Sequence, residues 1–182
     1  ALNEDGSNLA NVLHELLKGN NDRRKLENLL NDCLPFVESI CTEKNFDKSI
    51  SYKVKERYST KSLYANFLSD GTVNILALIV ALYFEKNCGI IVLEEPERNL
   101  HPYLMNKLME MAKEKSNEKQ IIITTHTPEL LKHAESNVIL FASRSIDGFT
   151  NVTHPTDSTM VQEFLKQEIG LDSLFIQNLL GE

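Results

Sequence analysis

The stretch of sequence that decides the fold is residues 90–97, which read IIVLEEPE. Its four apolar residues, three of them β-branched, predict a buried strand. Glu94 and Glu95 follow at the end of this strand, and Pro96 stops it. Acidic side chains at the carboxyl end of a buried parallel strand are the arrangement that Mg²⁺-dependent phosphate chemistry uses. The pair therefore predicts a metal and water site, with a solvated acidic turn as the alternative.

Strands and helices alternate along the chain, which predicts an α/β fold. Continuously apolar strands predict a parallel sheet that is covered by helices on both faces. Residues 1–67 are expected to form a helical segment with a small antiparallel strand layer, and residues 68–182 a second domain. We expect helices at 8–18, 22–41, 70–87, 103–116, from 127 and at 159–168, strands at 49–58, 89–93, 120–125 and 137–142, a hairpin at 146–153 and an apolar tail at 171–180.

Composition is that of an ordinary soluble globular protein. The chain has 182 residues, 42% hydrophobic and 25% charged. No apolar run reaches the roughly 18–20 residues of a membrane span, so we expect a cytoplasmic protein without a membrane partner. The net charge of −7 argues against a dominant nucleic-acid-binding face, although a local basic patch remains compatible with it. The three cysteines lack zinc spacing and are expected to be reduced thiols.

Two further motifs lie at the ends of regular elements. Leu68–Thr72, which reads LSDGT, opens the buried helix, and a helix N-terminus is a natural phosphate site. Ser69 adds a hydroxyl, and Gly71 lets a ligand approach the backbone. Residues 121–126 read IIITTH, a second buried strand that ends in His126. Taken singly, the first motif also fits a plain helix cap and His126 a structural histidine.

Taken together, these motifs resemble those of ABC-type ATPases. Leu68–Thr72 resembles the signature motif, Ile90–Glu95 the Walker B strand, and Thr124–His126 the switch-histidine loop. Pro96–Pro102 resembles the D-loop region of the RecF/SMC/OLD-like branch of AAA-family ATPases, and Glu4–Ala10 is similar to a segment of the same proteins. The resemblance implies a P-loop NTPase-type parallel sheet with flanking helices. It identifies the chain as the C-terminal lobe of an ABC ATPase head.

The resemblance also implies roles for the acidic pair and the histidine. Glu95 would polarise the water that attacks the γ-phosphate of ATP. Glu94 would hold Mg²⁺, usually through water. His126 would contact the γ-phosphate and sense its loss.

A second set of roles concerns the opposite head of a dimer. Ser69, Asp70 and Gly71 would bind the γ-phosphate of ATP held by that head, and Asn99 would lie at the dimer seam. The resemblance thus implies a homodimer of heads with ATP between them. DNA maintenance or defence against phage DNA, with DNA bound in the full assembly, is what the group implies.

The chain departs from the family pattern in two ways. Glu94 stands where the family usually has Asp, and its side chain is one methylene longer. No stretch matches G-x-x-x-x-G-K-[ST], because none of the seven glycines precedes a lysine. We therefore expect this chain alone to be inactive. ATP and Mg²⁺ would need a missing N-terminal lobe, encoded upstream in the same gene or present in a partner chain.

Two other functions compete with this interpretation. The chain could be a nucleotide-binding domain fragment of an ABC transporter, but residues 73–78 read VNILAL where transporter heads usually have Gln and Arg. It could also be a non-catalytic protein-interaction module. The retention of Glu95 together with His126 argues against such a module.

Overall fold

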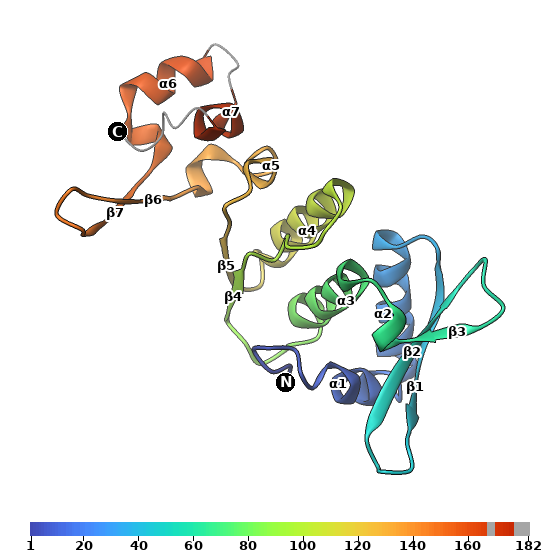
Figure 1. Ribbon diagram of the computed structural model, residues 1–182. Helices are drawn as coiled ribbons and strands as arrows, with labels where there is room; N and C mark the ends of the chain where they lie inside the picture. Colours follow the sequence, from blue (N-terminus) through green and yellow to red (C-terminus); the bar gives the residue numbers. More distant parts are fainter. Residues whose placement is uncertain (167–169, 177–182) are drawn as a thin grey trace. The chain divides into compact units, whose positions relative to one another are not determined.

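The computed structural model describes residues 1–166 and 170–176, and the chain forms two compact units, 1–124 and 125–182 (Figure 1). Each unit is described by itself. The domain boundary expected between residues 67 and 68 lies inside the first unit and stays a prediction. Within the described residues, no helix combines the length and the apolar character needed to cross a membrane.

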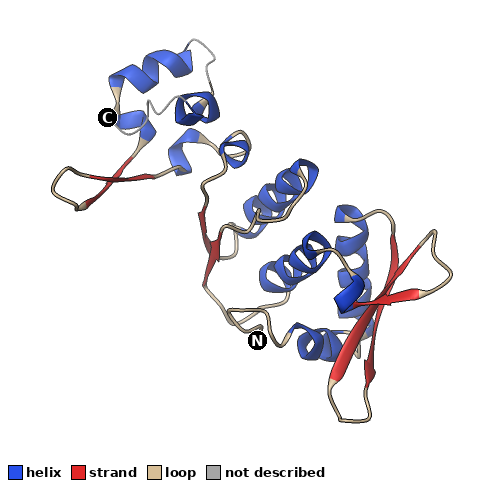
Figure 2. Ribbon diagram, in the orientation of Figure 1, coloured by secondary structure: helices blue, strands red, loops and turns tan. Residues whose placement is uncertain are grey.

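The first unit begins with two helices and an antiparallel sheet in the order β1-β2-β3 (Figure 2). Their bounds are α1 Leu9–Leu16, α2 Asn20–Cys33, β1 Val37–Lys44, β2 Ile50–Glu56 and β3 Ser62–Tyr64. The buried apolar side chains of α1 and α2 pack on the face of the sheet that carries Ile40 and Val54. The predicted antiparallel layer is therefore confirmed, and it has three strands.

The second predicted helix was wrong beyond Cys33. We expected it to run to about Cys41, but β1 begins four residues after Cys33, and Cys41 lies on that strand. Pro35 disfavours helical backbone at the residue before it, and Leu34 accordingly has φ −127° and ψ 79°. The β-branched residues that follow then favour a strand.

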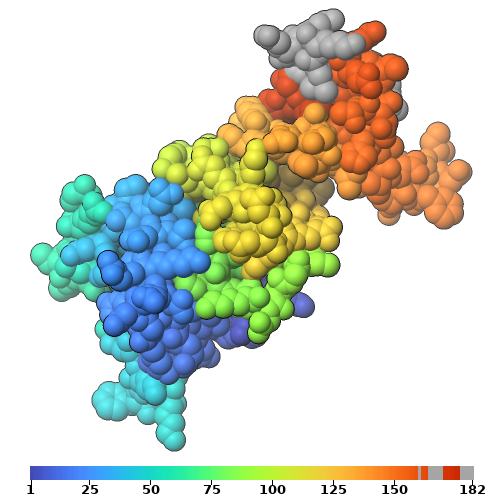
Figure 3. Space-filling view, turned by 180° about the vertical axis from the view of Figure 1, so that it is seen from behind, coloured from blue at the N-terminus to red at the C-terminus, as the bar shows by residue number. Residues whose placement is uncertain are grey.

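Helix α3, Asp70–Tyr83, is the buried helix of the first unit. Ile75, Leu76 and Ile79 are fully buried, which confirms the helix that the apolar run predicted. It ends four residues earlier than expected. Its neighbours are α2 and α4, Pro102–Lys115, and Figure 3 shows the blue segment of α2 beside the yellow-green segment of α4 at the surface. An ion pair between Lys107 Nζ and Asp32 Oδ2 (3.1 Å) joins α4 to α2.

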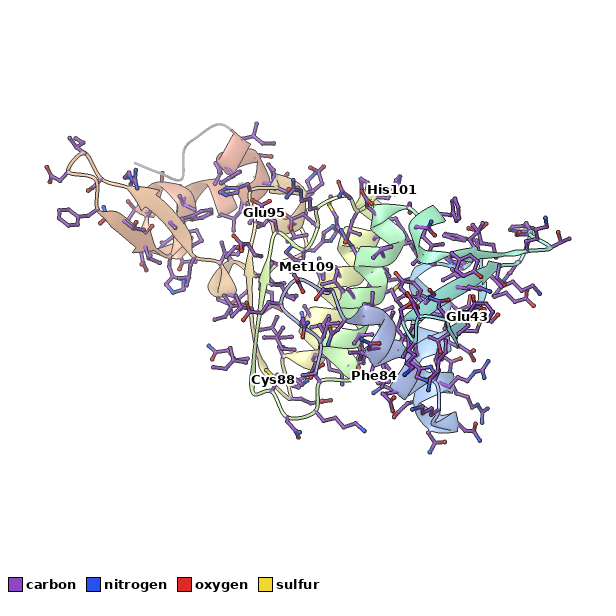
Figure 4. The ribbon with its side chains drawn as sticks, turned by 60° about the horizontal axis from the view of Figure 1, so that its bottom comes forward. Glu43, Phe84, Cys88, Glu95, His101 and Met109 are labelled. Atoms are coloured by element: carbon purple, nitrogen blue, oxygen red, sulfur yellow. The ribbon has the colours of Figure 1, made fainter. Side chains whose placement is uncertain are left out.

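Strands β4, Ile90–Glu94, and β5, Gln120–Thr124, form the predicted parallel pair, in register from Ile90 opposite Gln120 to Glu94 opposite Thr124. The expectation that both faces would be covered is wrong. The side chains on one face are open to solvent, with exposed fractions of 53% for Ile90, 63% for Val92 and 44% for Ile122. Successive side chains of a strand point to opposite faces, and within the first unit α3 and α4 lie on one side of the pair only (Figures 1 and 4).

The second unit has its own small core of Ile139, Val161, Leu171 and Leu174. Its helices and strands are α5 Pro128–Leu131, β6 Phe141–Arg144, β7 Thr150–Thr153, α6 Thr159–Lys166 and α7 Leu171–Ile176. It also has two 3-10 turns, Ser136–Val138 and Pro155–Asp157. A third 3-10 turn, Ala65–Phe67, belongs to the first unit.

The strand expected at 137–142 was displaced. Residues 136–138 form a 3-10 turn, and the strand begins at Phe141 and pairs antiparallel with β7. The predicted hairpin is confirmed, and Gly148 takes the positive φ of its turn, +85°. The last two residues of the helix expected at 159–168, and the tail after Ile176, lie outside the described residues.

Candidate functional site

The acidic pair lies where β4 ends. Glu94 is the last residue of the strand and is exposed, and Glu95 is partly buried. The Glu95 N–H donates to the Thr124 carbonyl of β5 (3.0 Å), so the parallel ladder continues one step past the strand. Figure 4 shows Glu95 at the opposite end of β4 from Cys88.

Glu95 has a backbone conformation that is unfavourable for a residue with a side chain. Its φ is +42°, in the left-handed region. Such a conformation costs about 1 kcal/mol or more and persists where the surrounding structure imposes it. The chain passes here from strand β4 into the loop that follows.

The loop after the acids, residues 95–101, is a series of turns. The Arg98 N–H donates to the Glu95 carbonyl (3.0 Å), and the Leu100 N–H donates to the Glu97 carbonyl (2.9 Å). The side chains of Glu97 and Leu100 are buried, with 4% and 7% exposed. Asn99 has φ +62°, a conformation that asparagine tolerates better than most residues. The loop is therefore fixed to the body of the first unit at both ends.

Ser69 caps the N-terminus of α3. Its Oγ accepts a hydrogen bond from the Thr72 N–H (3.2 Å) and lies 2.9 Å from the Thr72 Oγ1, and its carbonyl accepts from the Val73 N–H (3.1 Å). A serine hydroxyl has one donor and two acceptor positions. When the Thr72 hydroxyl donates to the Ser69 Oγ, the Ser69 O–H is able to donate to an anion. The first N–H groups of a helix, here those of Asp70 and Gly71, have no partner within the helix and are directed toward its N-terminal end.

The start of α3 touches the loop that carries the acids. A Cβ added to Gly71 would lie 2.8 Å from the Asn99 carbonyl oxygen, so glycine is required by this close approach. One turn further along α3, the Asn74 side-chain amide donates to the Arg98 carbonyl (2.8 Å). The structure thus brings Ser69, Asp70 and Gly71 next to the loop of Glu95 and Asn99. Sequence reasoning gave Asn74 no role, although it is the amide within the apolar run of α3.

His126 belongs to the second unit, two residues after the end of β5. It is exposed, and the next residue, Thr127, donates its N–H to the Thr125 Oγ1 (2.9 Å). The chain therefore connects His126 directly to the strand end beside Glu94.

The acidic pair can supply only some of the ligands of an Mg²⁺ ion. Among residues 1–166 and 170–176, no three His, Cys, Asp or Glu side chains are grouped to hold a metal ion. In phosphate sites, however, Mg²⁺ takes one or two carboxylates and completes its shell with water and phosphate oxygens. An exposed Glu94 meets that lesser demand.

The first unit has one hollow that lies away from the acids. A shallow hollow lined by His14, Leu17, Arg23, Cys41 and Thr42 lies on α1 and β1. Figure 4 shows Glu43, the neighbour of Thr42, far from Glu95. This hollow is therefore separate from the acids and the start of α3.

Two lysines of strand β2 are paired with acids of β1. Lys53 Nζ lies 2.6 Å from Glu43 Oε2, and Lys55 Nζ lies 2.8 Å from Glu38 Oε2. The hydrogen bond from Lys53, with a second from the Tyr64 hydroxyl, lowers the pKa of Glu43, and the same bond to Glu43 raises the pKa of Lys53. These two pairs therefore neutralise part of the positive charge of the sheet.

Comparison with known proteins gives a family and two relatives. Residues 3–132 match the family model described as "AAA domain, putative AbiEii toxin, Type IV TA system". Septu protein PtuA of Bacillus thuringiensis is 26% identical over 145 residues, which is 69% of this chain and 37% of that protein. An uncharacterised protein of Methanocaldococcus jannaschii is 25% identical over 176 residues, 83% of this chain and 45% of that protein. The chain thus spans less than half the length of both relatives.

Similar solved structures are heads of SMC proteins. One, from work on ATP-driven dimerization and DNA-stimulated activation of SMC ATPases, has a TM-score of 0.62 and 17% identity, and covers 89% of this chain and 96% of that one. The Smc head of Pyrococcus furiosus, bound to the C-terminal domain of ScpA, has a TM-score of 0.59 and 18% identity, over 79% of this chain and 37% of that one. The resemblance expected from the motifs is confirmed: the protein belongs to this AAA domain family and has the fold of an SMC-type ATPase head.

Proposed function

We propose that this chain is the C-terminal, catalytic lobe of an ATP-hydrolysing head that works as a dimer. The observation that carries the proposal is the contact between the start of α3 and the loop that follows the acids. The Gly71 position lies so close to the Asn99 carbonyl oxygen that a Cβ would be 2.8 Å from it. A helix end suited to phosphate and a pair of carboxylates are therefore parts of one rigid unit.

Glu95 is the proposed catalytic residue. Its carboxylate would orient and polarise the water that attacks the γ-phosphate, and Glu94 would hold Mg²⁺ through water. His126 would contact the γ-phosphate from the loop after β5. Bound Mg-ATP would supply the phosphoryl group and the cation that neutralises its developing charge.

The start of α3 is the proposed contact with the nucleotide of the opposite head. The Ser69 O–H and the N–H groups of Asp70 and Gly71 would bind that γ-phosphate, because the N-terminal end of a helix attracts anions. The Asp70 carboxylate opposes this attraction, so it must point away from the phosphate. Asn99 would lie at the seam between heads. A similar solved structure comes from work on ATP-driven dimerization of SMC ATPases, which supports a dimeric arrangement.

A second lobe is required for nucleotide binding. The sequence has no phosphate-cradling loop, and we propose that an N-terminal lobe, in the same polypeptide or in a partner chain, supplies it. The family description names a toxin and a toxin–antitoxin system, and the solved relatives include a DNA-stimulated ATPase. We therefore place the complete protein in DNA maintenance or phage defence, in the cytoplasm.

Substitution of Glu95 in the complete protein tests the proposal. Glu95→Gln should bind ATP as the unaltered protein does but hydrolyse it at least about 100-fold more slowly, the usual contribution of a general base. Glu110→Gln, an exposed change on α4, is the matched control and should keep full activity. Turnover by Glu95→Gln close to that of the control would refute the catalytic role.

Calorimetric titration of the chain alone tests the need for a second lobe. Mg-ATP should give no binding isotherm in the micromolar range, because the sequence has no G-x-x-x-x-G-K-[ST] loop to bind the phosphates. Tight binding to this chain would contradict the proposal that the nucleotide site is completed elsewhere.

A further inference from the structure

Asn74 is the amide side chain that interrupts the apolar run of α3. Its Nδ2 donates to the Arg98 carbonyl across 24 residues of sequence, at 2.8 Å. The acceptor is a main-chain group, so the bond fixes the backbone of the loop and not merely a side chain. The bond therefore restrains the path of the chain three residues after Glu95.

Arg98 is also tied to the acidic pair. Its N–H donates to the Glu95 carbonyl (3.0 Å), so the Arg98 peptide units connect Asn74 on one side with Glu95 on the other. The next residue, Asn99, has a left-handed backbone conformation, and its carbonyl lies against Gly71. The loop thus meets α3 at two successive carbonyls, one bonded to an amide and one in close contact with a glycine.

These contacts join two groups with different proposed ligands. The start of α3 would contact the nucleotide of the opposite head, whereas Glu95 would act on the nucleotide of its own head. A shift of α3 by the partner's γ-phosphate would move the Asn74 amide, and with it the Arg98 carbonyl and the turn that holds Glu95.

We propose that Asn74 is a positioning residue that couples the two ATP sites of the dimer. It sets the position of Glu95 according to whether the opposite site is filled. This inference rests on the proposed function. It adds a route by which one site controls the other, through the hydrogen bond from Asn74 to the Arg98 carbonyl.

A merely structural role for Asn74 predicts different results. Loss of the amide would then lower stability and leave the dependence of turnover on ATP unchanged. A coupling role predicts a lower kcat and a lower Hill coefficient with ATP binding retained. The kcat, KM and Hill coefficient of the complete protein therefore separate the two roles.

The experiment compares Asn74→Ala with Asn106→Ala in the complete protein. Asn106 is the matched control, since its amide donates to Glu110 within α4 (3.0 Å). Without nucleotide, hydrogen exchange at the Arg98 and Leu100 amides should be about fivefold faster in Asn74→Ala, which corresponds to one hydrogen bond of about 1 kcal/mol. With Mg-ATP, kcat should fall about five- to tenfold, KM should change less than about twofold, and the Hill coefficient should fall to about 1.

A second variant keeps the test valid if Asn74→Ala fails to fold. Asn74→Asp preserves the shape of the side chain but offers no N–H to the Arg98 carbonyl, so it should reproduce the loss of cooperativity. The inference is overturned if either Asn74 variant has the same exchange rates and the same Hill coefficient as the Asn106→Ala control. Complete protein that hydrolyses no ATP before any substitution would instead refute the proposed function, so the two failures are distinguishable.

Discussion

Replacement of Gly71 by alanine tests the contact between α3 and the loop after the acids. The new Cβ would lie 2.8 Å from the Asn99 carbonyl oxygen, about 0.6 Å inside the 3.4 Å at which ordinary contact begins. The opposing atom is main chain, so it cannot turn aside as the end of a flexible side chain would. Either α3 or the loop must shift.

The sign of the effect follows from two opposing terms. Forcing a methyl group into a well-packed position costs about 1–3 kcal/mol. Alanine in place of glycine recovers about 0.4–1 kcal/mol, because it restricts the unfolded chain and favours the helix. We therefore expect Gly71→Ala to lower the free energy of unfolding by about 0.5–2 kcal/mol. Gly89→Ala is the control, since nothing lies within 4 Å of its Cβ position, and it should be neutral or stabilising.

Urea unfolding followed by circular dichroism measures this difference. With a urea dependence of about 1–3 kcal/mol per molar, the midpoint of Gly71→Ala should fall by roughly 0.2–2 M. In an Asn74→Ala background the loop can yield, so Gly71→Ala should then cost less, by about 0.5 kcal/mol or more. A Gly71→Ala protein that is as stable as Gly89→Ala would refute the close approach on which the site geometry depends.

Three further outcomes are expected. Ser69→Arg in the complete protein should abolish ATP-driven dimerisation in light scattering while each head still binds ATP; unchanged dimerisation would exclude contact in trans. Burial raises the pKa of the Cys33 thiol to about 11. In a mass-spectrometric time course at pH 8, Cys33 should therefore be alkylated far more slowly than the exposed Cys88. Equal rates for the two thiols would contradict the burial of Cys33. Leu108→Ala should lower stability by about 2–5 kcal/mol, because its side chain is fully buried, and a loss below 1 kcal/mol in urea would contradict this packing.

The parallel pair and the buried helix were predictable because each carries its signal locally. Residues 90–93 are apolar and end at two carboxylates, and α3 is apolar almost throughout. Both patterns can be identified from the local sequence without knowledge of the tertiary contacts. The position of Glu94 at the end of β4, paired with Thr124, follows directly from them.

The course of the chain after Cys33 was less predictable because two signals compete there. Leucines at helical spacing precede Pro35, and the residues after it are compatible with a continued, kinked helix. The strand Val37–Lys44 forms because it pairs with Ile50–Glu56, in register from Ser39 opposite Lys55 to Lys44 opposite Ile50, with an irregularity between Val37 and Ser39. That pairing is a tertiary interaction, and no local pattern encodes it.

The exposed face of the parallel pair was unpredictable for another reason. A continuously apolar strand predicts burial on both faces, but a face becomes buried only when another element covers it. Val92 and Ile122 lie on a face that no element of the first unit covers, and their side chains are open to solvent. The apolar residues therefore make burial of both faces of the pair favourable. Whether a face is buried depends on the elements that cover it.

Asn74 shows where sequence reasoning about the site reaches its end. An amide in an apolar helix is conspicuous in the sequence, and in the structure Asn74 is half-buried and bonded to the Arg98 carbonyl. Its partner is a carbonyl, however, and every residue has one. The residue type at position 98 therefore could not mark its carbonyl as the hydrogen-bond partner of Asn74. The motif residues were found because their chemistry is specific, whereas the groups that join them act through the backbone, and only coordinates assign such contacts.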